Sequence, residues 1–250
     1  MTKFTEKNSY TIIFSVIMVL VVGSLLAGVA QGLRGKIDEN KRFEKQQNIL
    51  YAMGVNNNES DTDVSFIPTK EVEATFKKYI TKQLVCQGDK ISEDNTAYLI
   101  DIKKEETLAK KEDYQRRLPL FIGEKEGEKY YIIPMRGKGL WDAVWGYIAL
   151  DKNYVVQGVF FDHKGETPGL GANINQRFFM DDFTGEKIFQ GTTFKGITVA
   201  KGNNDPLNND KDDNEIDALA GATITGNGIT AMIKKDLKLY LPCLEKIINN

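Results

Sequence analysis

The chain has 250 residues, 33 basic and 35 acidic side chains, a formal net charge of −2 and 41% hydrophobic residues. With one His and two Cys far apart in the sequence, it cannot by itself build an iron–sulfur cluster, a structural zinc site or a bis-His haem site, and it can form at most one disulfide. The near-zero net charge argues against nucleic-acid binding, and the hydrophobic content argues against a wholly disordered chain.

An apolar segment near the N-terminus predicts one membrane-spanning helix. No residue between Lys7 and Arg34 is charged. As a helix, the run 10–30 would extend about 31 Å, which matches the hydrocarbon thickness of a bilayer. We therefore expect an N-terminal tail at 1–9 and a transmembrane helix at 10–33.

The alternative for this segment is a cleaved signal peptide, because the small residues Gly28, Val29 and Ala30 resemble a cleavage site. The apolar run is longer than the usual signal core, which favours an uncleaved anchor. Lys and Arg are more numerous after the segment than before it, which weakly favours a cytoplasmic C-terminal flank. Long domains cross membranes largely regardless of such charges, so composition leaves the orientation open.

Residues 34–125 are expected to form a membrane-proximal region of helices and strands. Apolar residues at helical spacing predict helices at 38–53 and 68–84, which a polar loop at 54–61 separates. The other elements expected here are strands at 97–102 and 118–122 and a charge-rich loop or short helix at 103–117.

Residues 126–250 are expected to form the main domain of an α+β fold. Residues 127–228 hold 15 of the 22 glycines, which indicates either many tight turns or a ligand pocket lined by backbone. The expected elements are strands at 130–134, 147–150, 155–161 and 197–200, and a final helix over 229–244 that Pro242 breaks or kinks.

Two motifs in this domain combine glycines with aromatic or polar side chains. The first is Gly137-Lys-Gly-Leu-Trp141, in which Trp141 is either a core residue or a wall for a flat aromatic ligand. The second is His163-Lys-Gly-Glu-Thr-Pro-Gly-Leu-Gly171. It is either a plain turn between a strand and a helix or a polar rim for a heteroaromatic ring, with Glu166 and Thr167 at its shoulder.

The third motif is Asp217-Ala-Leu-Ala-Gly-Ala-Thr-Ile-Thr-Gly-Asn-Gly228, directly before the final helix. Thr223 is expected near the helix N-terminus, where free N–H groups and the helix dipole favour a phosphate. The alternative is a glycine-rich turn with a Thr or Asn helix cap. The glycine spacing fits neither a P-loop nor a dinucleotide fingerprint. The acidic segment 203–214 upstream lacks the glycine and glutamate of an EF-hand and is expected to be a solvated loop.

In this order, Gly-Lys-Gly-Leu-Trp, His-x-x-Glu-Thr-Pro-Gly-Leu-Gly and Asp-x-x-x-Gly-Ala-Thr resemble the covalent-FMN domain of bacterial respiratory complexes. With the single N-terminal span, the chain most closely resembles the C-subunit family of the sodium-translocating NADH:quinone oxidoreductases. The resemblance covers the span and about residues 130–240. The second motif has one residue more after His163 than is usual in the family.

The resemblance implies that FMN is joined by its phosphate to a threonine hydroxyl. The matching acceptor is Thr223, with Asp217, Gly221 and Ala222 in place. The sequence departs from the family pattern at Ala220, where Ser or Thr is usual. Thr225 is the alternative acceptor.

The same resemblance suggests which other side chains surround the flavin. Leu140, Trp141 and Leu170 are candidates to flank the ring. Candidates for its polar edge are Glu166, Thr167 and the backbone at Gly169. Lys201 is a candidate to offset the charge of the phosphate or the flavin. No catalytic residue and no metal ligand is expected.

The resemblance also implies an electron-carrier subunit in the bacterial inner membrane, with its FMN domain on the periplasmic side. The implied partners are the other membrane subunits of the complex and a flavin transferase. NADH oxidation and an ion path are not expected in this chain, which lacks a nicotinamide fingerprint and has one uncharged span.

Three other functions remain open at this stage. The G subunit of ferredoxin-linked Rnf complexes has the same domain and anchor. A membrane-tethered binding or scaffold protein would have no redox role, and a flavin-based regulatory sensor would not turn over with quinone. Whether Cys86 and Cys243 pair is also open.

Overall fold

A computed structural model describes residues 8–202, 205 and 208–249. Most of the expected tail at 1–9 and part of the expected loop at 203–214 lie outside the described residues. The chain divides into two compact units, Met1–Phe43 and Glu44–Asn250.

The described part of the first unit is helical. Helix α1 (Asn8–Ala52) contains the expected segment 10–33, and by length and composition it is able to cross a membrane. Its apolar side chains over 12–29 are exposed, as expected for a surface that faces lipid. The helix predicted separately at 38–53 is continuous with this segment, because no helix-breaking residue apart from Gly35 lies between them.

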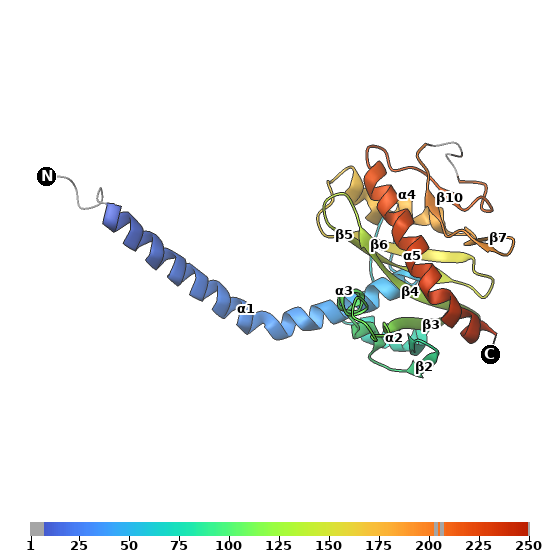
Figure 1. Cartoon of the computed structure of the whole chain (residues 1–250), viewed down its shortest axis with the longest axis horizontal. Helices are drawn as coiled ribbons and strands as arrows, with labels where there is room; N and C mark the ends of the chain where they lie inside the picture. Colours follow the sequence, from blue (N-terminus) through green and yellow to red (C-terminus); the bar gives the residue numbers. More distant parts are fainter. Residues whose placement is uncertain (1–7, 203–204, 206–207, 250) are drawn as a thin grey trace. The chain divides into compact units, whose positions relative to one another are not determined.

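The second unit is built on one six-stranded sheet with the order β2-β1-β3-β4-β5-β6 (Figure 1). Every neighbouring pair in it is antiparallel. The strands are β1 (Ile80–Gln87), β2 (Lys90–Glu93), β3 (Leu118–Lys125), β4 (Glu128–Lys138), β5 (Ala143–Leu150) and β6 (Val156–His163). The sheet therefore takes strands from both of the regions expected at 34–125 and 126–250.

Short elements complete this unit. They are α2 (Val72–Tyr79), η2 (Ala97–Leu99), α3 (Ile102–Leu108), η3 (Gly171–Asn175), α4 (Arg177–Met180), η4 (Asp181–Phe183), β7 (Phe189–Gln190), β8 (Thr193–Phe194), β9 (Thr198–Val199) and β10 (Glu215–Ile216). The mixture of one antiparallel sheet with helices is the expected α+β fold.

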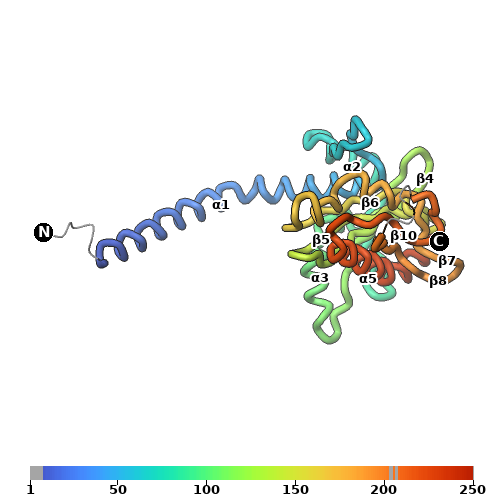
Figure 2. Tube along the Cα trace, turned by 90° about the horizontal axis from the view of Figure 1, so that it is seen from above, coloured from blue at the N-terminus to red at the C-terminus, as the bar shows by residue number. Residues whose placement is uncertain are grey.

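The long C-terminal helix α5 (Thr223–Ile248) lies across the sheet, as both views of the chain show (Figures 1 and 2). Its apolar stripe, which includes Ile229, Ile233 and Leu237, is fully buried. Gly137 in β4 allows close packing, because a Cβ there would lie 2.7 Å from the Cβ of Met232. Tyr240 donates a hydrogen bond of 3.0 Å to the Pro119 carbonyl, so the helix is held along its length.

A disulfide joins Cys86 of β1 to Cys243 of α5, with the two Cα atoms 6.3 Å apart. The bond closes a chain segment of 157 residues and ties β1 to the C-terminal helix. Both cysteines of the chain are used, so the pairing that the sequence left open is answered.

The predicted strands at 118–122, 130–134, 147–150 and 155–161 are confirmed within β3–β6, apart from Val155, which directly precedes β6. The strand predicted at 197–200 is reduced to β9, which pairs in parallel with β10.

Three predictions about secondary structure are wrong. The helix predicted at 68–84 ends at Tyr79, because the next eight residues pair with β3 as strand β1. The strand predicted at 97–102 is the turn η2 followed by α3, whose N-terminus the Asp101 carboxylate caps by accepting from the Lys104 N–H. The expected break at Pro242 is wrong, because the last helix continues to Ile248, while the alternative of a kink there stays a prediction. The buried neighbours Tyr240 and Leu244 explain why packing outweighs the missing N–H.

Candidate functional site

Three loops meet at one end of the sheet, and each carries one of the sequence motifs. The turn 139–142 joins β4 to β5, and Val144 at the start of β5 pairs with His163 at the end of β6. The loop 163–171 therefore leaves the sheet beside that turn. The backbone of Gly228, one turn into α5, packs against the Lys138 carbonyl, which brings the start of α5 to the same place.

The buried carboxylate of Glu166 connects all three loops. Its Oε1 accepts hydrogen bonds from the N–H groups of Trp141 (2.9 Å) and Asp142 (3.5 Å). Its Oε2 accepts a hydrogen bond of 2.6 Å from the Thr225 hydroxyl, in α5. Its own N–H donates to Nδ1 of His163 at 3.1 Å, which fixes the loop backbone.

These hydrogen bonds keep Glu166 ionised. Burial raises the pKa of Glu166, but the hydrogen bonds from Thr225 and from the backbone at Trp141 outweigh that effect, so the net pKa lies below its usual value. A carboxylate with several donors is thus available to join the loops at neutral pH.

Trp141 is exposed at the surface, with 67% of its surface accessible, so the interpretation of Trp141 as a core residue is wrong. Its indole Nε1–H donates to the Thr167 hydroxyl at 3.2 Å, which fixes the ring orientation. Leu140 and Leu170 are also exposed, at 44% and 41%. Exposed apolar side chains held by polar contacts form a surface suited to a flat ring.

Glycines are required where the loops approach each other. Gly221 has φ +69°, and a Cβ there would lie 2.7 Å from Cδ2 of Leu170. A Cβ on Gly171 would lie 2.5 Å from both Oε2 of Glu166 and the Thr225 hydroxyl oxygen. These two positions explain why small residues occur in both motifs.

Helix α5 begins at Thr223, whose side chain is exposed, whereas Thr225 is 1% exposed and bonded to Glu166. The predicted Thr or Asn cap is wrong, because the N-cap residue is Ala222 and no side chain among the described residues caps the helix. The first helical hydrogen bond runs from the Gly226 N–H to the Ala222 carbonyl. The N–H groups of the first turn are therefore available to a ligand.

The remaining expected residues lie around this helix start. Asp217 is half-buried. Burial raises the pKa of the neighbouring Asp182 carboxyl to about 6, and the negative charge of Asp217 adds to this shift. Gly169 is exposed in the second loop with φ +76°. Lys201 is exposed, and among the described residues no hydrogen bond or ion pair joins it to the three loops.

The sequence motifs did not reveal two features of the site. Ile224, next to Thr223, is 57% exposed and gives the start of α5 an exposed apolar side chain. The role of Thr225 as the partner of Glu166 was also missed. Thr225 follows the helix start Thr223 by two residues, and side chains two residues apart point to different faces of a helix. This spacing was the only signal in the sequence that the Thr225 hydroxyl faces inward.

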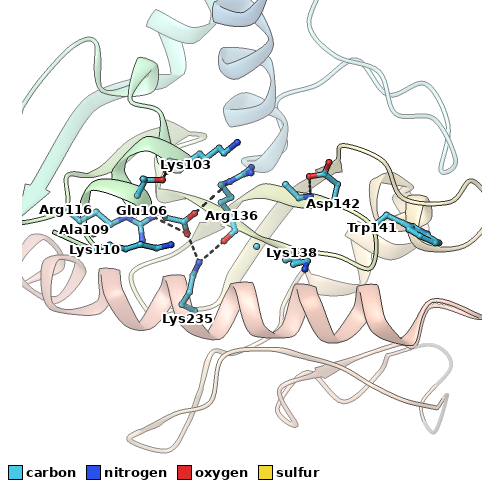
Figure 3. A pocket seen from close by; sticks show the side chains of 13 residues that line it. Lys103, Glu106, Ala109, Lys110, Arg116, Arg136, Lys138, Trp141, Asp142 and Lys235 are labelled. Atoms are coloured by element: carbon cyan, nitrogen blue, oxygen red, sulfur yellow. Dashed lines mark hydrogen bonds and ion pairs between the residues drawn. The ribbon is translucent and has the colours of Figure 1, made fainter.

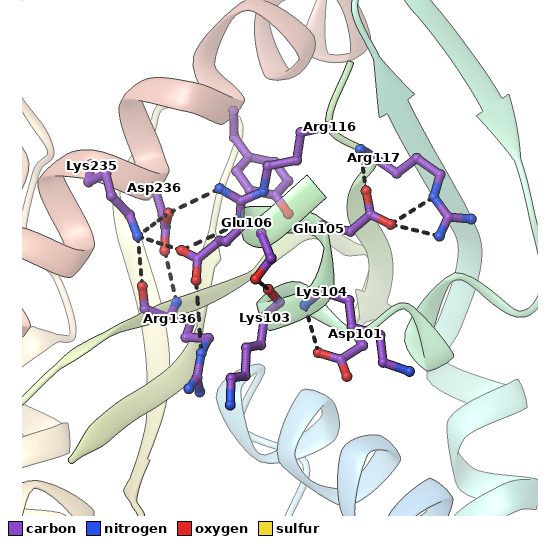
Figure 4. A network of polar contacts seen from close by, with 12 residues as sticks. Asp101, Lys103, Lys104, Glu105, Glu106, Arg116, Arg117, Arg136, Lys235 and Asp236 are labelled. Carbon is purple, nitrogen blue, oxygen red and sulfur yellow. Dashed lines mark hydrogen bonds and ion pairs between the residues drawn. The ribbon is translucent and has the colours of Figure 1, made fainter. Parts of the chain in front are cut away.

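A basic pocket of about 610 Å³ adjoins Trp141 and was not predicted (Figure 3). Its walls come from α3 and the loop after it, the end of β4, the β4–β5 turn and α5. Glu106 pairs there with Lys235 (2.7 Å), Arg116 (3.8 Å) and Arg136 (3.9 Å). The Asp236 carboxylate accepts a hydrogen bond from the backbone N–H of Arg136. Figure 4 shows that this network joins α3, β4 and α5.

Known proteins resemble the chain over nearly its whole length. Residues 139–238 match the family described as FMN-binding domain. The C subunit of the Na(+)-translocating NADH-quinone reductase of Neisseria meningitidis serogroup B is 28% identical over 99% of this chain and 98% of its own. The corresponding protein of Haemophilus ducreyi is 29% identical over 94% and 91%.

A solved structure gives the same result. The C subunit of the Na(+)-translocating NADH-quinone reductase of Parabacteroides distasonis is 30% identical, with a TM-score of 0.71 over 85% of this chain and 96% of the solved one. Sequence and fold therefore agree, and the chain belongs to the C-subunit family of the Na(+)-translocating NADH-quinone reductases.

Proposed function

We propose that this chain is the membrane-anchored flavoprotein subunit of such a reductase, and that it carries electrons on an FMN joined through its phosphate to the Thr223 hydroxyl. Family membership and the match to the FMN-binding domain support the flavoprotein role. The observation that carries the choice of attachment site is the contrast between exposed Thr223 and buried Thr225.

The residues at the start of α5 suit a phosphodiester. The uncapped first turn offers N–H groups, and the helix dipole favours a negative charge there. Gly221 and Ala222 leave little side-chain bulk beside the hydroxyl. Ala220, where the family usually has Ser or Thr, is exposed, so the substitution removes no buried contact.

The apolar walls suit the flavin ring, which when bound supplies one- and two-electron redox chemistry. Leu140, Trp141 and Leu170 would cover its faces, and Ile224 would offer a further exposed apolar side chain beside Thr223. Thr167 would orient Trp141, and Glu166 would hold the three loops in register. Gly169 and its neighbours would offer backbone groups to the polar edge, and Asp217 would support the turn before Thr223.

We propose that the domain lies on the periplasmic side of the inner membrane. The disulfide between Cys86 and Cys243 supports this side, because such bonds persist in oxidising compartments. The Lys and Arg count of the flanks favoured the opposite side only weakly. Covalent attachment would also prevent loss of the flavin outside the cell.

The proposed partners are the other membrane subunits, which would supply and accept the electrons, and a flavin transferase that installs the FMN. NADH oxidation and ion movement would belong to those subunits. No hydrogen bond or ion pair joins Lys201 to the three loops in the described part of the chain, so its proposed role in charge compensation rests on the resemblance alone.

Visible spectroscopy of the chain within its complex tests the carrier role. In membranes that contain all subunits, NADH should bleach the flavin absorbance of this chain, and quinone should restore it. The purified chain without the other subunits should not respond to NADH. Covalent flavin that stays oxidised during turnover of the complex would contradict a carrier and favour a sensor.

A further inference from the structure

The basic pocket beside Trp141 carries a strong local excess of positive charge. Six basic and two acidic side chains line it, so the lining has four excess positive charges, although the whole chain has a net charge of −2. The basic residues are Lys103, Lys110, Arg116, Arg136, Lys138 and Lys235. Such a concentration in a concave surface attracts multivalent anions.

The six basic side chains fall into two groups. Arg116, Arg136 and Lys235 share Glu106, so the fold itself partly neutralises them. The other three are exposed lysines around the rim, and within the described ranges no hydrogen bond or ion pair joins their ammonium groups to a carboxylate. These three rim lysines are Lys103, Lys110 and Lys138.

The pocket also borders the candidate flavin site. Trp141 lines the pocket and contacts Thr167 of the loop that would hold the ring, and Asp142, another lining residue, donates its N–H to Glu166. Figure 3 shows Trp141 and Lys138 along the same side of α5. A molecule that occupies the pocket would therefore lie next to the surface through which electrons would leave or arrive.

We propose that the basic pocket docks an acidic surface, a cluster of Asp and Glu side chains, on the subunit that exchanges electrons with this chain. This proposal rests on the proposed carrier function. Charge complementarity selects the partner: exposed rim lysines are suited to adjustable contacts with a protein surface, and opposite charges orient two redox proteins before transfer. The Glu106 network keeps α3, β4 and α5 together behind that surface.

Zero-length cross-linking of the assembled complex in its membrane tests the contact directly. A carbodiimide activates a carboxyl group, and a lysine in contact with that group then forms an amide bond while the activating group leaves as a urea. Peptide mass spectrometry should find the rim lysines joined to Asp or Glu of another subunit. Lys82 and Lys152, exposed and outside the pocket, should give no such product.

Either of two results in the assembled complex would overturn the docking proposal. One is that no inter-subunit amide forms and that, in the assembled complex, an acetylating reagent modifies the rim lysines as fast as it modifies Lys82 and Lys152. The other is slow acetylation that returns to normal when the complex is delipidated with its subunits still together. That second result, or protection of the purified chain by inorganic phosphate alone, would identify a lipid headgroup or a free anion as the occupant.

Charge reversal gives a second measurement. Lys110→Glu combined with Lys138→Glu should slow electron transfer between this chain and its partner about tenfold at low ionic strength, and the effect should shrink in high salt. Lys82→Glu with Lys152→Glu makes the same change in net charge and should leave the rate unchanged. Equal slowing in both pairs would contradict a local docking site. Flavin content is measured first, so a chain without flavin would count against the carrier function instead.

Discussion

At the residue scale, the site depends on one buried carboxylate. Glu166 accepts hydrogen bonds from the β4–β5 turn and from α5, and it lies in the loop 163–171 itself. If this carboxylate is removed, the Thr225 hydroxyl loses its acceptor at a buried position that water does not reach. Its contribution should therefore exceed that of an ordinary surface hydrogen bond.

We predict that Glu166→Ala lowers the free energy of unfolding by about 2–4 kcal/mol, since it leaves the buried Thr225 hydroxyl and two part-buried N–H groups without an acceptor. Glu166→Gln keeps one acceptor oxygen and should cost about half as much. Thermal unfolding of the full chain in detergent, followed by Trp fluorescence, gives the comparison. If both variants unfold like the wild type, Glu166 does not hold the loops together.

Glu186 provides a prediction of pH dependence. Its side chain is fully buried, and among the described residues its Oε2 has no hydrogen-bond partner. The Nζ of Lys211 lies 3.7 Å from its Oε1. Burial raises the pKa of Glu186 to about 7. At a pH between the pKa of Glu186 in the unfolded chain and about 7, the folded chain binds a proton at Glu186 that the unfolded chain has released. Because the folded state binds more protons, lowering the pH from 8 to 5 should increase the free energy of unfolding.

The expected gain from pH 8 to pH 5 is about 1–3 kcal/mol, measured as the free energy of unfolding in urea. Glu186→Gln should remove the share of Glu186 in this gain, because the amide does not titrate, while Asp182, whose pKa burial raises to about 6, should keep the rest. A variant with the same pH dependence as the wild type would show that another group is responsible.

At the element scale, helix α5 combines two roles. Its first turn forms part of the candidate site, and its last turns are fixed to the sheet by Tyr240 and by the disulfide at Cys243. Because the helix is continuous through Pro242, both ends belong to one rigid element. The disulfide should therefore stabilise the domain without taking part in flavin binding.

Replacing both cysteines by serine should lower the free energy of unfolding by about 2–5 kcal/mol, since a long loop is no longer closed in the unfolded chain. Calorimetry of the full chain measures the effect. Flavin content at low temperature should be unchanged in this variant. A loss of flavin without a loss of stability would mean that the bond shapes the site itself.

The motifs predicted the elements of the site better than its contacts. The strands β3–β6 and the position of Thr223 at a helix start follow from periodicity and from the glycine-rich turn. The end of α2 at Tyr79 does not, because pairing with β3 decides where the strand begins. The Glu166–Thr225 bond joins residues 59 positions apart, and the lining of the basic pocket comes from α3, β4, β5 and α5, so neither leaves a local pattern.

At the scale of the whole molecule, one apolar helix precedes a domain with a disulfide. This combination supports a single-pass anchor with the domain outside the cytoplasm. It also fits the family, since one component of a membrane reductase needs attachment and not an ion path of its own.

Protease treatment of spheroplasts tests this orientation. Residues 44–250 should be digested when the protease is added outside intact spheroplasts, and an N-terminal fragment containing the apolar helix should remain with the membrane. A cytoplasmic protein serves as the control for lysis. Full protection of the domain until the spheroplasts are lysed would place it on the cytoplasmic side.

The mass of the denatured chain and its tryptic peptides tests the central claim most directly. When the chain is expressed with a flavin transferase, the peptide containing Thr223 should gain the mass of one FMN less one water, and fragmentation should place the group on Thr223. Thr223→Ala should abolish the adduct, whereas Thr225→Val should keep it on a less stable fold, because Thr225 is buried against Glu166. An unmodified Thr223 peptide from the wild-type chain, or an adduct that persists in Thr223→Ala, would contradict the account.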